Sequence, residues 1–159
     1  PYIFNLTEQT YWKSTEKEKV KIQGRLLGGC VDTIRHLVGT PYGDVESFKK
    51  NFIEGDPIIW YLENAELSTT DLRRSLVQMK YAGWFENCTG IMFGRSPANT
   101  PVANYKIEDV YEEISRELQI PILYDIDCGH VPPQITLVNG AYAEVESENG
   151  QGTILQTYK

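Results

Sequence analysis

Hydrophobic residues along the chain fall into short apolar runs and into longer segments with a helical period. Partial alternation over residues 19–28 predicts a strand that leads into Gly28-Gly29. The apolar runs 57–63, 91–93 and 121–124 predict further, buried strands, and the first of these ends in a carboxylate. These segments supply the strands of a predicted central sheet.

Two longer segments have the spacing of amphipathic helices. One begins at Ser68, which forms an S-x-x-D capping box with Asp71, and it ends at Gly83. The other covers residues 107–118, where apolar residues recur at offsets of 3, 4, 7 and 11. A shorter helix is predicted over residues 31–38. We therefore expect helices between successive strands.

The order of these elements predicts an α/β fold. From residue 57 to 125 strands and helices alternate, which favours a partly parallel sheet with flanking helices. Three antiparallel strands are predicted after it, at residues 134–138, 141–145 and 153–157. They are joined by Asn139-Gly140 and Asn149-Gly150, which are strong hairpin sequences.

Length and charge narrow the classes of function. A chain of 159 residues corresponds to one domain, and a formal charge of −7 with a pI near 4.9 argues against nucleic acid as a partner. No apolar run is long enough to span a membrane. Cys30, Cys88 and Cys128 are widely spaced and form no CxxC pair, so the sequence predicts neither a disulfide framework nor a zinc site. These features favour a cytoplasmic protein.

The first residues differ in character from the rest. The chain opens Pro1-Tyr2-Ile3, and residues 5–19 are polar, with a Lys/Glu run. We interpret residues 1–19 as a linker from a missing N-terminal domain and residues 20–159 as the domain itself.

Two residues at strand ends are candidates for catalysis. Glu63 ends one predicted strand, and His130 follows another within a loop fixed by Gly129 and Pro132-Pro133. Groups beyond the carboxyl ends of parallel strands converge on one crevice, and a carboxylate beside an imidazole is the orienting half of a Ser-His-acid triad. The alternative is that Glu63 caps the helix at Ser68 and that His130 is a hydrogen-bonded loop residue.

The local nucleophile candidates are poor. Ser96 follows a strand in a segment that resembles a degenerate nucleophile elbow, but Pro97 has no N–H to offer an oxyanion. Cys128 is two residues from His130, although a Cys-His pair normally meets across a fold, so a small buried filler is the favoured role. His36 is interpreted as structural.

Other polar and aromatic clusters have simpler interpretations. Asp125, Asp127, Cys128 and His130 could form a metal cluster, but no second histidine stands at a ligand spacing, so we predict no metal. Four aromatic residues are predicted to belong mostly to the core: Trp60, Tyr61, Trp84 and Phe85.

Several segments, in order along nearly the whole chain, resemble one family. They are residues 24–32, 39–42, 59–63, 82–85, 90–95 and 125–134, which include GRLLGGCVD, GTPY, GIMFGR and DIDCGHVPPQ. The chain resembles the C-terminal domain of the LD-carboxypeptidase family of serine peptidases (peptidase S66), and the GRLLGGC segment is similar to the microcin C self-immunity branch. The resemblance implies a swivelling β/β/α fold.

The resemblance also implies a division of the catalytic residues between domains. Glu63 matches the triad glutamate and His130 the triad histidine, whereas the family's serine belongs to the N-terminal domain and has no counterpart here. The implied substrates are LD-peptide bonds of muropeptides or the amide of microcin-type peptidyl nucleotides, without cofactor. The implied partners are the N-terminal domain and a second copy in a homodimer. The competing hypothesis is a non-catalytic module that binds carbohydrate or nucleotide through its Asp-rich loop.

Overall fold

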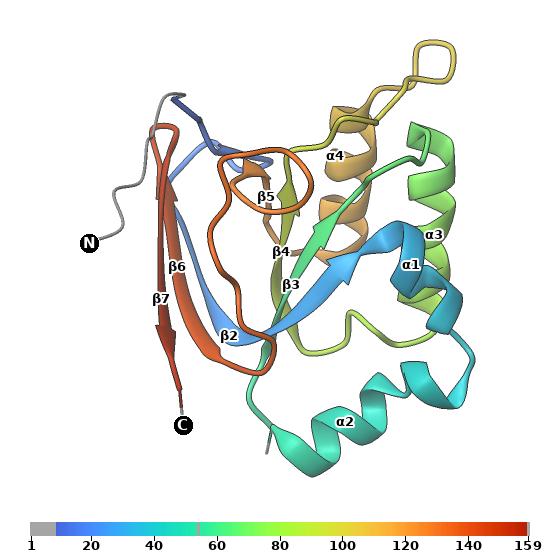
Figure 1. Ribbon diagram of the computed structural model, residues 1–159, viewed down its shortest axis with the longest axis vertical. Helices are drawn as coiled ribbons and strands as arrows, with labels where there is room; N and C mark the ends of the chain where they lie inside the picture. Colours follow the sequence, from blue (N-terminus) through green and yellow to red (C-terminus); the bar gives the residue numbers. More distant parts are fainter. Residues whose placement is uncertain (1–8, 54, 159) are drawn as a thin grey trace.

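A computed structural model describes residues 9–53 and 55–158 and shows one mixed sheet of seven strands with helices packed against it (Figure 1). The elements in chain order are β1 (Lys13–Ser14), β2 (Val20–Cys30), α1 (Val31–Ile34), η1 (Arg35–Leu37), η2 (Pro41–Gly43), α2 (Val45–Phe52), β3 (Ile58–Glu63), α3 (Thr69–Tyr81), β4 (Cys88–Gly94), α4 (Ile107–Leu118), β5 (Ile122–Ile126), β6 (Tyr142–Glu148) and β7 (Gln151–Thr157). The strand order across the sheet is β1-β5-β4-β3-β2-β6-β7.

The centre of the sheet is parallel and its edges are antiparallel. Strands β2, β3, β4 and β5 pair in parallel, whereas β1 pairs antiparallel with β5, and β6 pairs antiparallel with β2 and β7. The α/β prediction with a parallel core and antiparallel C-terminal strands is confirmed. The parallel arrangement brings the carboxyl ends of β3, β4 and β5 to the same edge.

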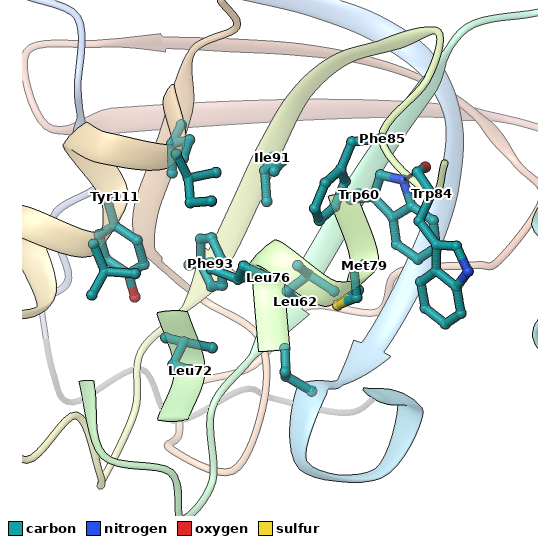
Figure 2. Packing of buried hydrophobic residues seen from close by; sticks show 14 of the residues in the cluster. Trp60, Leu62, Leu72, Leu76, Met79, Trp84, Phe85, Ile91, Phe93 and Tyr111 are labelled. Carbon is teal, nitrogen blue, oxygen red and sulfur yellow. Dashed lines mark hydrogen bonds between the residues drawn. The ribbon is translucent and has the colours of Figure 1, made fainter. Parts of the chain in front are cut away.

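Both faces of the central strands are buried, which explains their continuous apolar runs. On β3, Trp60 and Leu62 point into the core beneath α3 and α4, while Ile59 points into a second core on the opposite face. Figure 2 shows the first core, where Leu76 and Met79 of α3 meet these strand residues. The alternation along β3 places Glu63 on the same face as Ile59.

Aromatic rings fill the first core (Figure 2). Trp60 and Trp84 stack with ring centroids 5.3 Å apart, and Trp60 Nε1 donates to the Trp84 carbonyl over 2.8 Å. Phe93 and Tyr111 stack at 4.6 Å. The prediction that Trp60, Trp84 and Phe85 are core residues is confirmed, because each is at least 93% buried.

The second core is enclosed because the sheet curls. Trp12, just before β1, is buried in it, and its backbone N–H donates to the Gly150 carbonyl in the β6–β7 turn over 2.9 Å. The two ends of the sheet thus approach each other around Met92 and Ala143. Residues 1–8 of the interpreted linker lie outside the described residues, and the linker itself stays a prediction.

The helices and one hairpin follow the predicted positions. Ser68 caps α3, since its hydroxyl accepts from the Asp71 N–H, and α4 covers the whole predicted range. The hairpin at Asn149-Gly150 is confirmed by the β6–β7 pairing. The predicted helix over 31–38 is split into α1 and the 3₁₀ turn η1.

The predicted strand over residues 134–138 is wrong. This segment forms no ladder, because the side chain of Gln156 takes its hydrogen bonds. Gln156 Oε1 accepts from the Val138 N–H over 2.9 Å, and Gln156 Nε2 donates to the Thr136 carbonyl over 2.9 Å. Asn139 then binds the Gly28 N–H through Oδ1, so the segment crosses β2 as a loop.

Helix α2 was not predicted from the sequence, although its signals are present. Asp44 caps it by accepting from the Ser47 N–H over 2.9 Å, and Val45, Phe48 and Phe52 follow at helical spacing. The helix has only eight residues, about two turns, after its cap. A pattern this short is a weak signal for a helix.

Candidate active site

The backbone around Glu63 is fixed on several sides. Glu63 is the last residue of β3 and pairs in register with Cys30 of β2. Asp32 of α1 accepts from the backbone N–H groups of Ala65 and Glu66 at 2.9 and 2.8 Å. The turn that follows Glu63 is thereby tied to α1.

The same region contains an ionised carboxylate and a buried amide. Although partial burial opposes it, the bonds from two backbone N–H groups and the Cys30 thiol hold the pKa of Asp32 below its ordinary value. Asn64 is 1% exposed, and its side chain accepts from the Leu67 N–H and donates to the Leu67 carbonyl, each over 2.8 Å. These contacts leave Glu63 with a rigid backbone.

Glu63 and His130 are in direct contact. His130 lies in the loop after β5 that crosses the carboxyl ends of the parallel strands (Figure 1). Glu63 Oε2 accepts from the His130 backbone N–H over 2.8 Å and lies 2.8 Å from its Nδ1. Glu63 therefore binds the histidine twice and does not cap α3, where Ser68 does so.

Gly129 makes this close approach possible. Its φ is +99°, a backbone conformation that favours glycine. A Cβ at this position would lie 2.2 Å from Glu63 Oε2, which is far inside van der Waals contact. The Gly129 carbonyl accepts from Gln134 Nε2, which holds the turned peptide from the other side.

The contact has an electrostatic consequence for the imidazole. The hydrogen bond and the charge of Glu63 raise the pKa of His130 above its ordinary value, and the carboxylates of Asp32 and Glu66 add to this effect. The His130 side chain is 61% exposed, and no group in residues 9–53 or 55–158 hydrogen-bonds to its Nε2. With Nδ1 occupied, Nε2 is free to exchange a proton with a reactant.

The nucleophile candidates within this chain have other roles. Ser96 Oγ donates to the Asn64 carbonyl and accepts from the Ala98 N–H over 3.0 Å, so its hydroxyl is engaged in loop hydrogen bonds. Cys128 is 7% exposed in the second core, and burial raises the pKa of its thiol to about 12. A thiol of this kind is a filler and not an activated nucleophile.

The Asp-rich segment is held by protein cations and donors. Asp125 pairs with Lys13 at 2.7 Å, and Asp127 Oδ2 accepts from Trp12 Nε1 over 3.0 Å. Among the residues that the structure describes, no three His, Cys, Asp or Glu side chains are grouped to hold a metal ion. His36 lies exposed on η1.

One cavity lies away from the Glu63–His130 pair. It has a volume of about 550 Å³, lies between α2 and the sheet, and is lined by residues that include Phe48, Trp60 and Trp84. Neither Glu63 nor His130 lines it. At the pair itself, the His130 side chain is 61% exposed, whereas the Glu63 side chain is 12% exposed.

In the part of the chain that the structure describes, no helix is long and apolar enough to cross a bilayer.

The fold is that of an α/β domain with a mixed sheet, and the contact between Glu63 and His130 lies at the carboxyl edge of its parallel strands. Residues 23–145 match the family model for the LD-carboxypeptidase C-terminal domain, and the chain belongs to this family.

Named relatives agree with this assignment. The microcin C7 self-immunity protein MccF of Escherichia coli is 24% identical over 139 residues, which are 87% of this chain and 38% of MccF. The chain therefore spans about two fifths of the length of this relative.

Solved structures share the fold. The muramoyltetrapeptide carboxypeptidase from Oxalobacter formigenes has a TM-score of 0.72 at 19% identity, covering 91% of this chain and 50% of that one. MccF in complex with aspartyl sulfamoyl adenosine has a TM-score of 0.71 at 20% identity. The match covers 95% of this chain and 42% of the MccF chain. At these identities the structures establish the fold alone.

Proposed function

We propose that this chain supplies the acid and the histidine of a Ser-Glu-His triad in a serine carboxypeptidase. Glu63 is the acid and His130 is the base, and the serine comes from another domain of a longer protein, here called the full-length protein. The single observation that carries the proposal is the contact of 2.8 Å between Glu63 Oε2 and His130 Nδ1 at the carboxyl edge of the parallel strands. Membership of the LD-carboxypeptidase family supports it.

The geometry fits the chemistry of acyl transfer. Glu63 accepts from a protonated Nδ1, which selects the tautomer whose Nε2 carries a lone pair. Nε2 then takes the proton of the serine hydroxyl as the serine attacks the scissile carbonyl, and later returns a proton to the leaving amine. The Glu63 carboxylate stabilises the imidazolium between these steps.

The substrates that we propose follow from the relatives. The Oxalobacter enzyme acts on a muramoyl tetrapeptide, and MccF binds aspartyl sulfamoyl adenosine. We therefore propose either the LD-peptide bond of a muropeptide or the amide of a microcin-type peptidyl nucleotide. The triad mechanism itself calls for no metal or cofactor.

The test is mass spectrometry of products from the full-length protein, offered an LD-tetrapeptide and a peptidyl adenylate side by side. Loss of one D-alanine from the tetrapeptide indicates a cell-wall carboxypeptidase, whereas cleavage of the adenylate alone indicates an immunity peptidase. If neither mass changes, the peptidase proposal is wrong and the ligand-binding module takes its place.

Variants connect the activity to the two residues. We expect Glu63→Ala and His130→Ala each to lower kcat/KM by orders of magnitude, and the double variant to lose little more than the worse single one. His36→Ala is the matched control, because it removes the other histidine of the chain from an exposed position. The 159-residue chain alone is expected to be inactive. Turnover by the purified chain would contradict a serine supplied from elsewhere.

A further inference from the structure

The guanidinium of Arg95 is bound to the loop that carries His130. Arg95 directly follows β4, and its backbone N–H donates to the Ile126 carbonyl at the end of β5 over 3.1 Å. Its side chain, 18% exposed, donates to three consecutive carbonyls: Val131 at 3.3 Å, Pro132 at 3.1 Å and Pro133 at 2.8 Å. One cation from the central sheet thus spans the whole segment after His130.

Other hydrogen bonds hold the loop on either side of residues 131–133, at Gly129, His130 and Ile135, but none of those described is made by residues 131–133 themselves. Pro132 and Pro133 have no backbone N–H, and the His130 ring is mostly exposed, so packing does not fix it. A guanidinium presents several donors in a rigid fork, which a flexible ammonium cannot reproduce. Arg95 is therefore suited to hold consecutive carbonyls at fixed positions.

The guanidinium is itself anchored. Arg95 Nη2 lies 3.2 Å from Asp127 Oδ1, and the other oxygen of Asp127 accepts from Trp12 Nε1. The backbone carbonyl of Asp127 accepts from the Ile135 N–H over 2.7 Å, which closes the loop at its far end. Asp127 thus links the cation to the buried Trp12 and to both ends of the loop.

We infer that Arg95 is a positioning residue for His130: by holding the carbonyls of residues 131–133, it keeps the imidazole against Glu63. The catalytic consequence rests on the proposed function, but the geometric part is a property of this chain. Arg95 acts through the loop and has no contact of its own with the ring among the described hydrogen bonds.

The test is an NMR titration of the two histidines in the purified chain, for the wild type, Arg95→Lys and Arg95→Gln. The groups that influence the His130 ring are the carboxylates of Glu63, Asp32 and Glu66. If Arg95 positions the loop, the His130 pKa falls towards its ordinary value in both variants, because contact with Glu63 is loosened. His36 serves as the internal control, because it lies exposed on η1 and outside this loop.

A purely electrostatic role gives the opposite result. Arg95→Lys keeps the charge and would leave the His130 pKa unchanged, while Arg95→Gln removes a cation and would raise it. Either of these outcomes overturns the inference. Hydrogen exchange of the His130 amide, whose N–H binds Glu63, is the second measurement. Faster exchange confined to this loop supports positioning, whereas global unfolding of both variants shows a structural role and refutes it.

Kinetics of the full-length protein separate this inference from the proposed function. Arg95→Lys is expected to lower kcat about 10²-fold with a smaller change in KM, since a misplacement near 1 Å has an effect of this size. If the wild-type full-length protein shows no peptidase activity, the proposed function fails. The titration of the chain still decides whether Arg95 positions His130.

Discussion

Replacing Gly129 by alanine tests the Glu63–His130 geometry most directly. A Cβ at Gly129 would lie 2.2 Å from Glu63 Oε2, whereas ordinary contact begins at 3.4 Å, so the two must separate by 1.2 Å (3.4 − 2.2). Glu63 cannot move this far and keep both of its 2.8 Å contacts with His130. The substitution therefore separates Glu63 from His130 while both of these residues keep their own side chains.

The backbone adds a second, separable effect. Alanine at a φ of +99° is strained, and a left-handed backbone destabilises the fold by about 1–2 kcal/mol. Gly39→Ala is the matched control, because Gly39 also has a positive φ, of +80°, and its Cβ would meet nothing within 4 Å. Gly39→Ala measures the backbone strain alone in urea denaturation; Gly129→Ala should lose at least as much stability, and only this variant should disturb the histidine.

The assay is the NMR titration of the His130 ring. In Gly129→Ala its pKa should fall towards the ordinary value of about 6.5, since the bond and charge of Glu63 cause the upward shift. In the full-length protein, activity should drop about 10²-fold for a displacement near 1 Å. An unchanged His130 pKa in folded Gly129→Ala would refute the structural reasoning.

Three further predictions concern pH, packing and thiol reactivity. Because contact with Glu63 raises the pKa of His130, this contact stabilises the fold fully below pH ~6.5, and the stabilisation is lost as the pH rises through the folded-state pKa. In urea denaturation, Glu63→Gln should therefore lower the free energy of unfolding more at pH 5 than at pH 9. In the full-length protein, the same variant should shift the acid limb of the pH–activity profile to lower pH, because the His130 imidazole then stays neutral down to a lower pH. Leu76→Ala, fully buried, should lower the free energy of unfolding by about 2–5 kcal/mol, whereas Tyr81→Ala, 82% exposed on the same helix, should change it by less than about 0.5 kcal/mol. Cys128 should resist iodoacetamide at pH 8 in the folded chain and react rapidly in urea; equal rates would contradict its burial.

Local hydrophobic periodicity was sufficient to predict the helices and strands that bury one face or both. The predicted range 107–118 coincides with α4, and the run 57–63 differs from β3 by one residue, because apolar spacing reports burial directly. The same logic failed at residues 134–138, where alternating apolar residues suggested a strand. A side chain from β7, Gln156, takes the hydrogen bonds there, and a distant partner leaves no local pattern.

The sequence by itself determined the α/β order of elements, the ends of the main helices, and the two residues worth testing. Only the tertiary structure decided that these residues meet, since Glu63 and His130 are 67 positions apart and their contact depends on a glycine at positive φ. It also showed the hydrogen bonds of Asp32 to the turn after β3 and those of Arg95 to the His130 loop, which the sequence did not predict. Periodicity is a property of neighbouring residues, whereas the hydrogen bonds from the Arg95 guanidinium to three loop carbonyls form only when distant segments of the chain have packed together.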